Sequence, residues 1–381
     1  MSAEITFRHA GKDDALGISN LYQNIYEGTY PDPTMKDLRL LKGVLSTNEY
    51  CWFIGEKNNE VVASVVYRVD VKNRLSKVFG AVVSPECRGH GTTQKLMVAG
   101  YEFMRQEATP VEVVYATTRT VSFEPQKLTA NLGYKKLGVF PNVHKTDSYE
   151  THCLTAHFSK EALDKRFTDF ALHPQIQPIY EIVRRECGLA PLRTATVEYT
   201  TTAEAKHPPK LETIGAPLFV RHRFLDEKVT MDEHEWFFPF HEPNLLLTAP
   251  DQSVEIFAFL SEADKHCVLI GIRDNNKVGL SAILGAATKV LRDMGVRYVE
   301  FIVRADETQK IQTAFESQYI PSAYFPAMQL SHGARYDFVV FSRSFEILNF
   351  QDAHLEGINL EYLRLYSQYW EKIALAPLME K

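Results

Sequence analysis

The sequence predicts an α+β protein built on a mixed sheet, and three observations point to this class. Strand and helix patterns alternate through the first 160 residues. Three consecutive strand-like runs within residues 51–83 are joined by short polar turns, which favour antiparallel neighbours. A similar series of patterns returns in the second half of the chain, which indicates duplication, although two unrelated α+β units are the alternative.

The elements of the first half follow from local patterns. ITFRHA is predicted as a strand, residues 13–26 as an amphipathic helix, and residues 34–45 as a second helix after a Pro-rich loop. The antiparallel strands, a helix from about Thr93 to Gln106 and a further strand come next. A helix at 125–131 precedes the last two strands. The sequences of these strands are, in chain order, CWFIGEK, VVASVVYRVDV, KVFGAVV, VEVVYATT, GYKKLGVF and THCLTAHF.

The remaining segments are assigned more simply. Residues 165–192 carry a helical pattern with flanking prolines and are predicted as a linker helix, and KHPPK at 206–210 as an exposed turn. The last 30 residues predict an amphipathic helix that docks through a Leu and Tyr stripe. The repeat matches YKKLGVFP, from Tyr134, with YIPSAYFP, from Tyr319.

The composition excludes several classes of protein. The 42 basic and 48 acidic residues give a net charge of −6, so nucleic acid is not expected as the main partner. No run approaches the roughly 18 apolar residues of a membrane span, and the charged start does not resemble a secretory signal. The five cysteines lie far apart without a CxxC pair, which is typical of free thiols. We expect a cytoplasmic protein without membrane or nucleic-acid partners.

The loop at residues 83–93, VSPECRGHGTT, carries the most chemical information. Consecutive N–H groups at a helix N-terminus bind anions, and Gly89 and Gly91 allow the backbone to approach a diphosphate. Arg88 adds charge, while Thr92 and Thr93 can cap the helix or donate to phosphate. A plain turn that caps a surface helix is the alternative. The loop lacks the GK[ST] of a P-loop and the GxGxxG of a dinucleotide fingerprint.

The segment V-x-P-x-x-R-G-x-G-T, with the element order of residues 3–160, resembles the GNAT superfamily of acyl-CoA N-acyltransferases. Its motif R/Q-x-x-G-x-G/A is matched by Arg88, Gly91 and, loosely, Thr93. The resemblance implies that the loop amides hold the pyrophosphate of coenzyme A and that the strand end at 81–83 pairs with pantetheine. It also implies that the Val83 N–H faces the thioester oxygen. The implied coenzyme residues are Val83, Arg88, Gly89, His90, Gly91, Thr92 and Thr93, with Ser122, where the family often has Asn, and Gln126.

The catalytic groups depart from the family pattern. Thr129 stands where a tyrosine commonly protonates the leaving thiolate, and a threonine hydroxyl is too weak an acid for this task. Tyr30, with Tyr26 and Glu27, lies in the loop that borders the acceptor site of such folds and suits a cationic amine; inward packing is the alternative. Tyr115 ends a strand at the cleft and is a candidate acid or acceptor contact, with core packing as its alternative.

The second copy has lost most of the motif. Only Gly279 remains, and Asp274 places a negative charge where phosphates would lie. We therefore expect two GNAT-like domains in tandem: a GNAT N-acetyltransferase domain at 1–164 and a degenerate GNAT-like domain at 196–348. A helical linker at 165–195 joins them, and a docking helix occupies 349–381. The second domain is expected to wall the acceptor cleft or to mediate association, such as a homodimer.

Two further segments have simpler interpretations. Residues 232–242, DEHEWFFPFHE, are rich in metal-ligand types but lack HExxH spacing, so we expect an acidic loop before a buried aromatic segment and no metal. Cys87 lies beside Arg88, but no His and Asn pair is arranged around it, so no thiol nucleophile is proposed.

The predicted function is transfer of an acetyl group from acetyl-CoA to a primary amine by direct attack. The acceptor is a small-molecule amine or a protein lysine. A non-catalytic acyl-CoA-binding regulatory or interaction protein is the alternative, for which Thr129 is the evidence. A purely structural pair of domains would require that the loop at 88–93 bind nothing.

Overall fold

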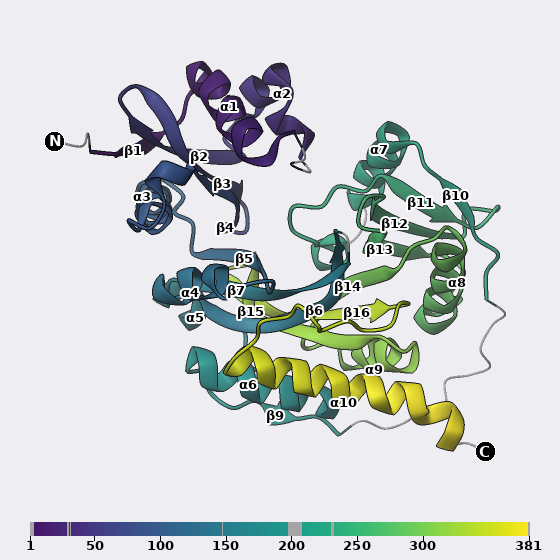
Figure 1. The fold of residues 1–381 in the computed structure, drawn as a ribbon. Coiled ribbons are helices and arrows are strands. Elements are labelled where there is room, and N and C mark those ends of the chain that lie inside the picture. Colours follow the sequence, from purple (N-terminus) through teal and green to yellow (C-terminus); the bar gives the residue numbers. More distant parts are fainter. Residues whose placement is uncertain are drawn as a thin grey trace.

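The computed structural model describes residues 4–28, 30, 32–146, 148–196, 208–229 and 232–379 (Figure 1). Within these residues, helices pack on a large mixed sheet, which confirms the predicted α+β class. No helix in the described part of the chain is both long and apolar enough to cross a membrane.

The first half of the chain forms the predicted series of elements. Its second helix begins later than predicted, because the Asp37 carboxylate caps it by accepting from the Arg39 and Leu40 N–H groups. The strands are β1 (Thr6–His9), β2 (Tyr50–Lys57), β3 (Glu60–Asp70), β4 (Leu75–Val83), β5 (Val113–Arg119), β6 (Lys135–Lys145) and β7 (Tyr149–Phe158). The helices are α1 (Ala15–Tyr26), α2 (Leu38–Val44), α3 (Thr92–Gln106) and α4 (Glu124–Asn131).

The second half contains a matching set of elements, shown in green in Figure 1. Its strands are β10 (Glu212–Ile214), β11 (Leu245–Thr248), β12 (Val254–Ser261), β13 (His266–Asp274), β14 (Tyr298–Arg304), β15 (Ile320–Ser331) and β16 (Ala334–Ser344). Its helices are α7 (Pro217–Lys228), α8 (Leu280–Asp293) and α9 (Thr308–Glu316), with a 3-10 turn η5 (Glu233–Trp236).

The order of the strands in the sheet repeats between the two halves. The sheet runs β1-β2-β3-β4-β5-β7-β6 and continues as β15-β16-β14-β13-β12-β11-β10, so the second half mirrors the first. In each half one neighbouring pair is parallel, β4 with β5 and β13 with β14, and the other pairs are antiparallel. This shared topology supports the duplication that the sequence repeat predicts.

The two halves meet where β6 pairs with β15. The bridge joins Gly138 to Ala323, and these two residues occupy equivalent positions in the repeated segments that begin at Tyr134 and Tyr319. A Cβ atom on Gly138 would lie 2.2 Å from the Ser322 carbonyl oxygen and 2.4 Å from the Ala323 Cβ. Glycine is therefore required for the close approach of the two strands.

Buried charge also connects the halves. The guanidinium of Arg335, which is fully buried, donates through Nε to the Glu112 carboxylate at 2.9 Å. Its other nitrogens donate to the carbonyl oxygens of Ala327 and Asn73, each at 2.9 Å. Arg335 belongs to β16, whereas Glu112 and Asn73 belong to the first half, so one side chain joins both.

The linker is less helical than predicted. Helix α6 spans only Gln177–Cys187, between a 3-10 turn with Pro174 at its start and Gly188 at a φ of +67°. A short helix α5 (Lys160–Asp164) and the parallel strands β8 (Ala171–Leu172) and β9 (Arg193–Thr194) complete this segment. Residues 206 and 207 of the predicted KHPPK turn lie outside the described residues.

The C-terminal helix α10 (Ile358–Met379) docks as its Tyr stripe predicts. It packs against β6, β15 and α6 and crosses the lower side of the molecule in Figure 1. Tyr362, Tyr366 and Tyr369 are buried on the core-facing side of the helix. The Tyr362 hydroxyl donates to the Lys136 carbonyl at 2.9 Å, and the Tyr369 hydroxyl donates to that of Gln175.

Candidate active site

An opening between β4 and β5 forms the centre of the candidate site. The two parallel strands pair only from Leu75 with Val113 to Lys77 with Tyr115. Beyond this point β4 continues to Val83 and β5 to Arg119 without pairing to one another. The separated strand ends leave backbone N–H and C=O groups free to bind an extended ligand.

A bulge in β4 widens this opening. Gly80 and Ala81 together face one residue of β3, and Gly80 has a φ of +62°. The Tyr22 hydroxyl donates to the Gly80 carbonyl, and a Cβ at Gly80 would lie 3.2 Å from the Tyr30 hydroxyl. The bulge thus lies against aromatic side chains of α1 and the following loop.

The backbone of Val83 faces the opening. The Ser84 N–H donates to the Val62 carbonyl at 2.8 Å, and Val83 lies opposite Ala63. Because hydrogen-bonding direction alternates along an antiparallel pair, the N–H and C=O of Val83 point away from β3. The Arg88 Nε donates to the Val83 carbonyl at 3.0 Å, so it lies on the side of β4 that faces away from β3.

The loop after β4 and the start of α3 form a pocket of about 430 Å³. Gly89 and Gly91 have φ values of +81° and +69°, and no side chain caps the first turn of α3. The Thr92 hydroxyl donates to the Cys87 carbonyl and stabilises the loop. The first N–H groups of α3 are therefore available to an anion. The lining residues include Ala81, Val83, Arg88, Gly89, Gly91, Thr92, Thr93, Glu124 and Pro125.

The other three residues predicted to bind coenzyme, His90, Ser122 and Gln126, do not line this pocket. His90 is exposed, with its Nδ1 2.7 Å from the Arg88 carbonyl, and Ser122 accepts through its carbonyl from Gln126. The Gln126 side chain is buried and donates to the His354 carbonyl at 2.8 Å, while its oxygen accepts from Asn359 at 2.8 Å. Gln126 thus anchors the C-terminal segment, and we leave it out of the proposed coenzyme site.

Thr129 has no free hydroxyl proton to offer. It is buried in α4, and its Oγ1 donates to the carbonyls of Pro125 and Gln126, at 3.2 and 3.1 Å. These bonds hold the hydroxyl within its own helix, and that Thr129 does not protonate a leaving group stays a prediction.

The two tyrosines proposed for catalysis lie in different surroundings. Tyr30 packs in a cluster with Tyr22 and Tyr26, and the centroid of its ring lies 4.9 Å from the centroid of each of theirs. Tyr115 lies at the last position of β5 that pairs with β4, and burial raises the pKa of its hydroxyl. Its ring contacts Phe325 of the second half, with 5.6 Å between centroids.

The Tyr115 side chain lines a cavity of about 390 Å³ between the two halves. The sequence did not predict this cavity. The first half contributes Lys77, Tyr115, Thr117, Phe140, Val143, His144, His152 and Leu154. The second contributes Phe238, Pro239, His241, Phe259, Ser261, Asp264, His266, Glu300, Ile302, Phe325, Met328 and Val340. Side chains alternate along a strand, so Lys77 and Val78 point to opposite faces, and Val78 packs with Leu96 of α3. The cavity and the α3 pocket therefore lie on opposite faces of the sheet.

The second half closes its equivalent of the α3 pocket with its own atoms. Asp274 ends β13, and its carboxylate accepts from the N–H groups of Val278 and Gly279, both at 2.9 Å. These amides precede α8 just as the loop amides precede α3. A carboxylate thus already lies at the loop amides where an anion would bind, and loss of the coenzyme from this copy stays a prediction.

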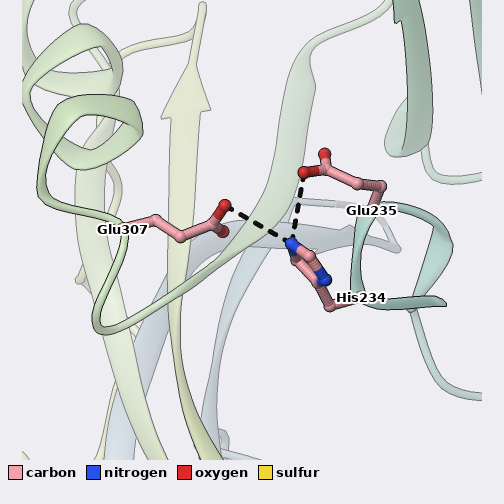
Figure 2. Close-up of side chains that lie close together, drawn as sticks. All are labelled: His234, Glu235 and Glu307. Carbon is pink, nitrogen blue, oxygen red and sulfur yellow. Dashed lines mark ion pairs between the residues drawn. The ribbon is translucent and has the colours of Figure 1, made fainter. Parts of the chain in front are cut away.

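The ligand-rich segment of residues 232–242 also fills space in the second half. Trp236 is buried with its ring over Gly271, where an added Cβ would lie 1.9 Å from Cε3. Figure 2 shows Glu235 and Glu307 both pointing at His234, whose Nε2 lies 3.2 and 3.6 Å from their carboxylates. The Lys310 ammonium lies 2.5 Å from Glu235 and 2.7 Å from Glu307. This cation already balances both carboxylates, so the cluster is an ion-pair network between η5 and α9.

Comparison with known proteins places the first half in a family. Residues 15–134 match the model of the acetyltransferase (GNAT) family. No curated protein matches the chain.

Several solved structures resemble part of the chain. Ribosomal-protein-S5-alanine acetyltransferase from Vibrio fischeri is 18% identical, with 42% of this chain and 97% of that chain covered and a TM-score of 0.36. Ribosomal-protein-alanine N-acetyltransferase from Brucella melitensis is 19% identical, with 40% and 99% covered and a TM-score of 0.36. These identities and TM-scores are too low to support an assignment of function, and the family assignment comes from the matched family model alone. The matched model thus identifies an acetyltransferase (GNAT) domain at residues 15–134.

Proposed function

We propose that the protein transfers an acetyl group from acetyl-CoA to a primary amine, with the coenzyme bound by the first half alone. The uncapped first turn of α3 behind Gly89 and Gly91 carries this proposal. Its N–H groups and those of the loop would bind the pyrophosphate, assisted by Arg88, Thr92 and Thr93. The open edge of β4 from Ala81 to Val83 would pair with the pantetheine arm.

The opening between β4 and β5 would join the two reactants. The coenzyme approaches from the α3 face, and the amine approaches from the cavity on the opposite face. The neutral amine nitrogen attacks the thioester carbon, and the carbon–sulfur bond breaks as the amide bond forms. The amine loses one proton, and the coenzyme leaves as a thiolate that gains one. The Val83 N–H would stabilise the oxyanion in between.

Much of the rate in such a reaction comes from positioning and oxyanion stabilisation. Tyr115 is proposed as an acceptor contact, because it lies where β5 stops pairing with β4 and lines the cavity. Tyr30 is proposed to support the bulge at Gly80, which it approaches together with Tyr22.

The second half is proposed to be a degenerate GNAT-like domain that walls the acceptor cavity. Its loop is closed by Asp274, and most of the cavity-lining residues belong to it. Residues 1–164 and 196–348 are the proposed domain limits. We further propose that the protein acts in the cytoplasm, where its five cysteines, all free, stay reduced. Formation of a homodimer stays a prediction.

Calorimetric titration with acetyl-CoA tests this proposal. Wild type is expected to bind one molecule per chain, and Arg88→Glu is expected to lose the binding because it places a negative charge beside the pyrophosphate. The matched control is Lys277→Glu, which makes the same kind of change on the equivalent loop of the second half and should bind like wild type.

Turnover then separates the two functions that the site allows. An enzyme releases free thiol from acetyl-CoA when a suitable amine is present, whereas a non-catalytic acyl-CoA-binding protein binds acetyl-CoA without thiol release. The bonds of Thr129 to its own helix favour the second function as the alternative. Failure of wild type to bind acetyl-CoA would exclude both.

A further inference from the structure

The cavity between the halves contains a cation and an anion that do not form an ion pair with each other. Lys77 comes from β4 and Glu300 from β14, and both line the cavity. Five strands separate β4 from β14 in the sheet, so the sheet must curve to bring the two side chains to one cavity.

The Lys77 ammonium is left without a polar partner. Among the described residues no carboxylate lies within the 4.0 Å of an ion pair, and its contact is the Tyr115 ring, 6.0 Å from the ammonium to the centroid. Burial lowers the pKa of Lys77, while the field of Glu300 acts to raise it. Lys77 is half-buried, and a cation that is partly removed from water without a nearby carboxylate is typical of a group that binds an anionic ligand.

Glu300 is likewise incompletely satisfied. Only 8% of its surface is exposed, and the His266 Nε2 lies 3.5 Å from its Oε1. That nitrogen is buried and makes no hydrogen bond in the described residues. His241, which also lines the cavity, donates through Nδ1 to the Pro239 carbonyl at 3.0 Å, and burial lowers its pKa to about 3, so it adds no charge.

The remaining walls are largely apolar. Phe140 and Leu154 come from the first half, and Phe259, Phe325 and Met328 come from the second. The volume of about 390 Å³ is at the small end of the range for small-molecule sites. The Asp264 carboxylate in this lining is already paired with His144, at 2.6 Å. The cavity therefore offers a compact ligand the Lys77 ammonium, the Glu300 carboxylate and a largely apolar wall.

We propose that this cavity binds an α-amino acid, with its carboxylate at Lys77 and its ammonium at Glu300, as the acceptor of the acetyl group. Only the statement that the amino acid accepts the acetyl group rests on the proposed function. A zwitterion satisfies both groups at once, since it places opposite charges about 3 Å apart and makes a hydrogen bond of about 2.8 Å at each end. A simple amine would leave Lys77 unpaired, and a simple acid would leave Glu300 unpaired.

Binding is tested first on the wild-type protein without coenzyme. Thermal-shift titrations use each of the twenty common L-amino acids as probes, and every amino acid that stabilises the protein is compared with its decarboxylated amine and its deaminated acid. We expect at least one amino acid to raise the unfolding midpoint saturably, and both truncated analogues to bind about tenfold more weakly or worse. Binding by none of the twenty, or equal binding by the amine, would overturn the proposal.

Substitutions then place the ligand. Lys77→Met and Glu300→Gln are each expected to weaken amino-acid binding by about tenfold or more, and both should keep wild-type affinity for acetyl-CoA. Lys289→Met, on the exposed side of α8, is the matched control and should bind the amino acid normally. Unchanged binding by Lys77→Met would overturn the proposal even if Glu300→Gln failed to fold.

The two proposals fail separately. Absence of acetyl-CoA binding together with amino-acid binding would remove the proposed function and leave a zwitterion site. Acetyl-CoA turnover with simple amines, together with no binding or acetylation of any amino acid, would remove only the inference made here.

Discussion

At the scale of single residues, Gly138 determines how closely the two halves approach. It lies opposite Ala323 in the bridge between β6 and β15, and any side chain there would meet backbone atoms that cannot rotate away. The repeat in the sequence aligned these two positions, but nothing in the local pattern indicated that they touch each other. Contacts between distant segments leave no trace in local periodicity, which is why the junction could not be predicted.

Gly138→Ala is expected to destabilise the protein by about 1–3 kcal/mol, the usual cost of overpacking a closely packed site. The measurement is urea unfolding followed by circular dichroism. Gly285→Ala is the control, because Gly285 lies in α8 with nothing within 4 Å of an added Cβ, and it should keep or raise stability. Equal stability of Gly138→Ala and wild type would contradict the tight junction.

Asp274 is the residue that closes the second loop. Asp274→Ala removes the acceptor of two N–H groups and should lower stability by about 1–3 kcal/mol. Its affinity for acetyl-CoA, measured by calorimetry, should equal that of wild type, because the coenzyme is proposed to bind the first half. A changed affinity would show that the second loop takes part in coenzyme binding.

At the scale of elements, a pH-sensitive ion pair joins β6 to the turn between β12 and β13. The His144 Nδ1 lies 2.6 Å from the Asp264 carboxylate, and this hydrogen bond raises the pKa of His144. Burial acts to raise the pKa of Asp264, but the bonds from His144 and Ser261 lower it to about 2. The pair is therefore charged on both sides near pH 6.

The sign of the pH dependence follows from these shifts. A raised histidine pKa contributes stability that is complete below the unfolded value and is lost as the pH rises through the folded value, whereas the lowered pKa of Asp264 matters only in acid. The stability difference between wild type and Asp264→Asn, about 1 kcal/mol or less, should thus be larger at pH 6 than at pH 9. Urea unfolding at both pH values checks this, and an equal difference at the two would contradict it.

Loss of the ion pair with the buried Arg335 side chain is expected to lower stability more than loss of the His144–Asp264 pair. Glu112→Ala removes the carboxylate that faces this fully buried guanidinium and should cost about 3–5 kcal/mol. Asp164→Ala breaks the exposed pair with Lys160 and serves as the control, with no measurable change expected. Thermal unfolding compares the two variants, and similar midpoints would contradict the role of the Arg335 network.

The elements of the first half could be predicted because each carries its own pattern. The strands of residues 51–83 alternate with short polar turns, and the glycines of residues 89 and 91 mark the loop before α3. The linker was predicted too long, since the helical pattern of residues 165–192 does not reveal that Pro174 and Gly188 bound a shorter helix. Local pattern thus predicts the type of an element better than its ends.

At the scale of the whole molecule, the two halves share one topology, and we propose that they have two different tasks, coenzyme binding and walling of the acceptor cavity. The first half keeps an open loop before α3, whereas the second half closes its loop with Asp274 and packs η5 against α9. The sequence motif predicts that the first loop binds the coenzyme, and Asp274 predicts that the second copy has lost it; both stay predictions. Lys77 and Glu300 could not be predicted as neighbours, because they come from different halves and meet only when the sheet curves.

A crystal structure of the protein with acetyl-CoA tests the central claim, that the first half binds the coenzyme and the second half walls the acceptor cavity. We expect one acetyl-CoA per chain, with its pyrophosphate at the N–H groups of residues 88–93 and its thioester in the opening between β4 and β5. The loop at residues 274–279 should keep the Asp274 bonds to Val278 and Gly279. Coenzyme bound at the second loop, or absent from the first at saturating concentration, would contradict the account.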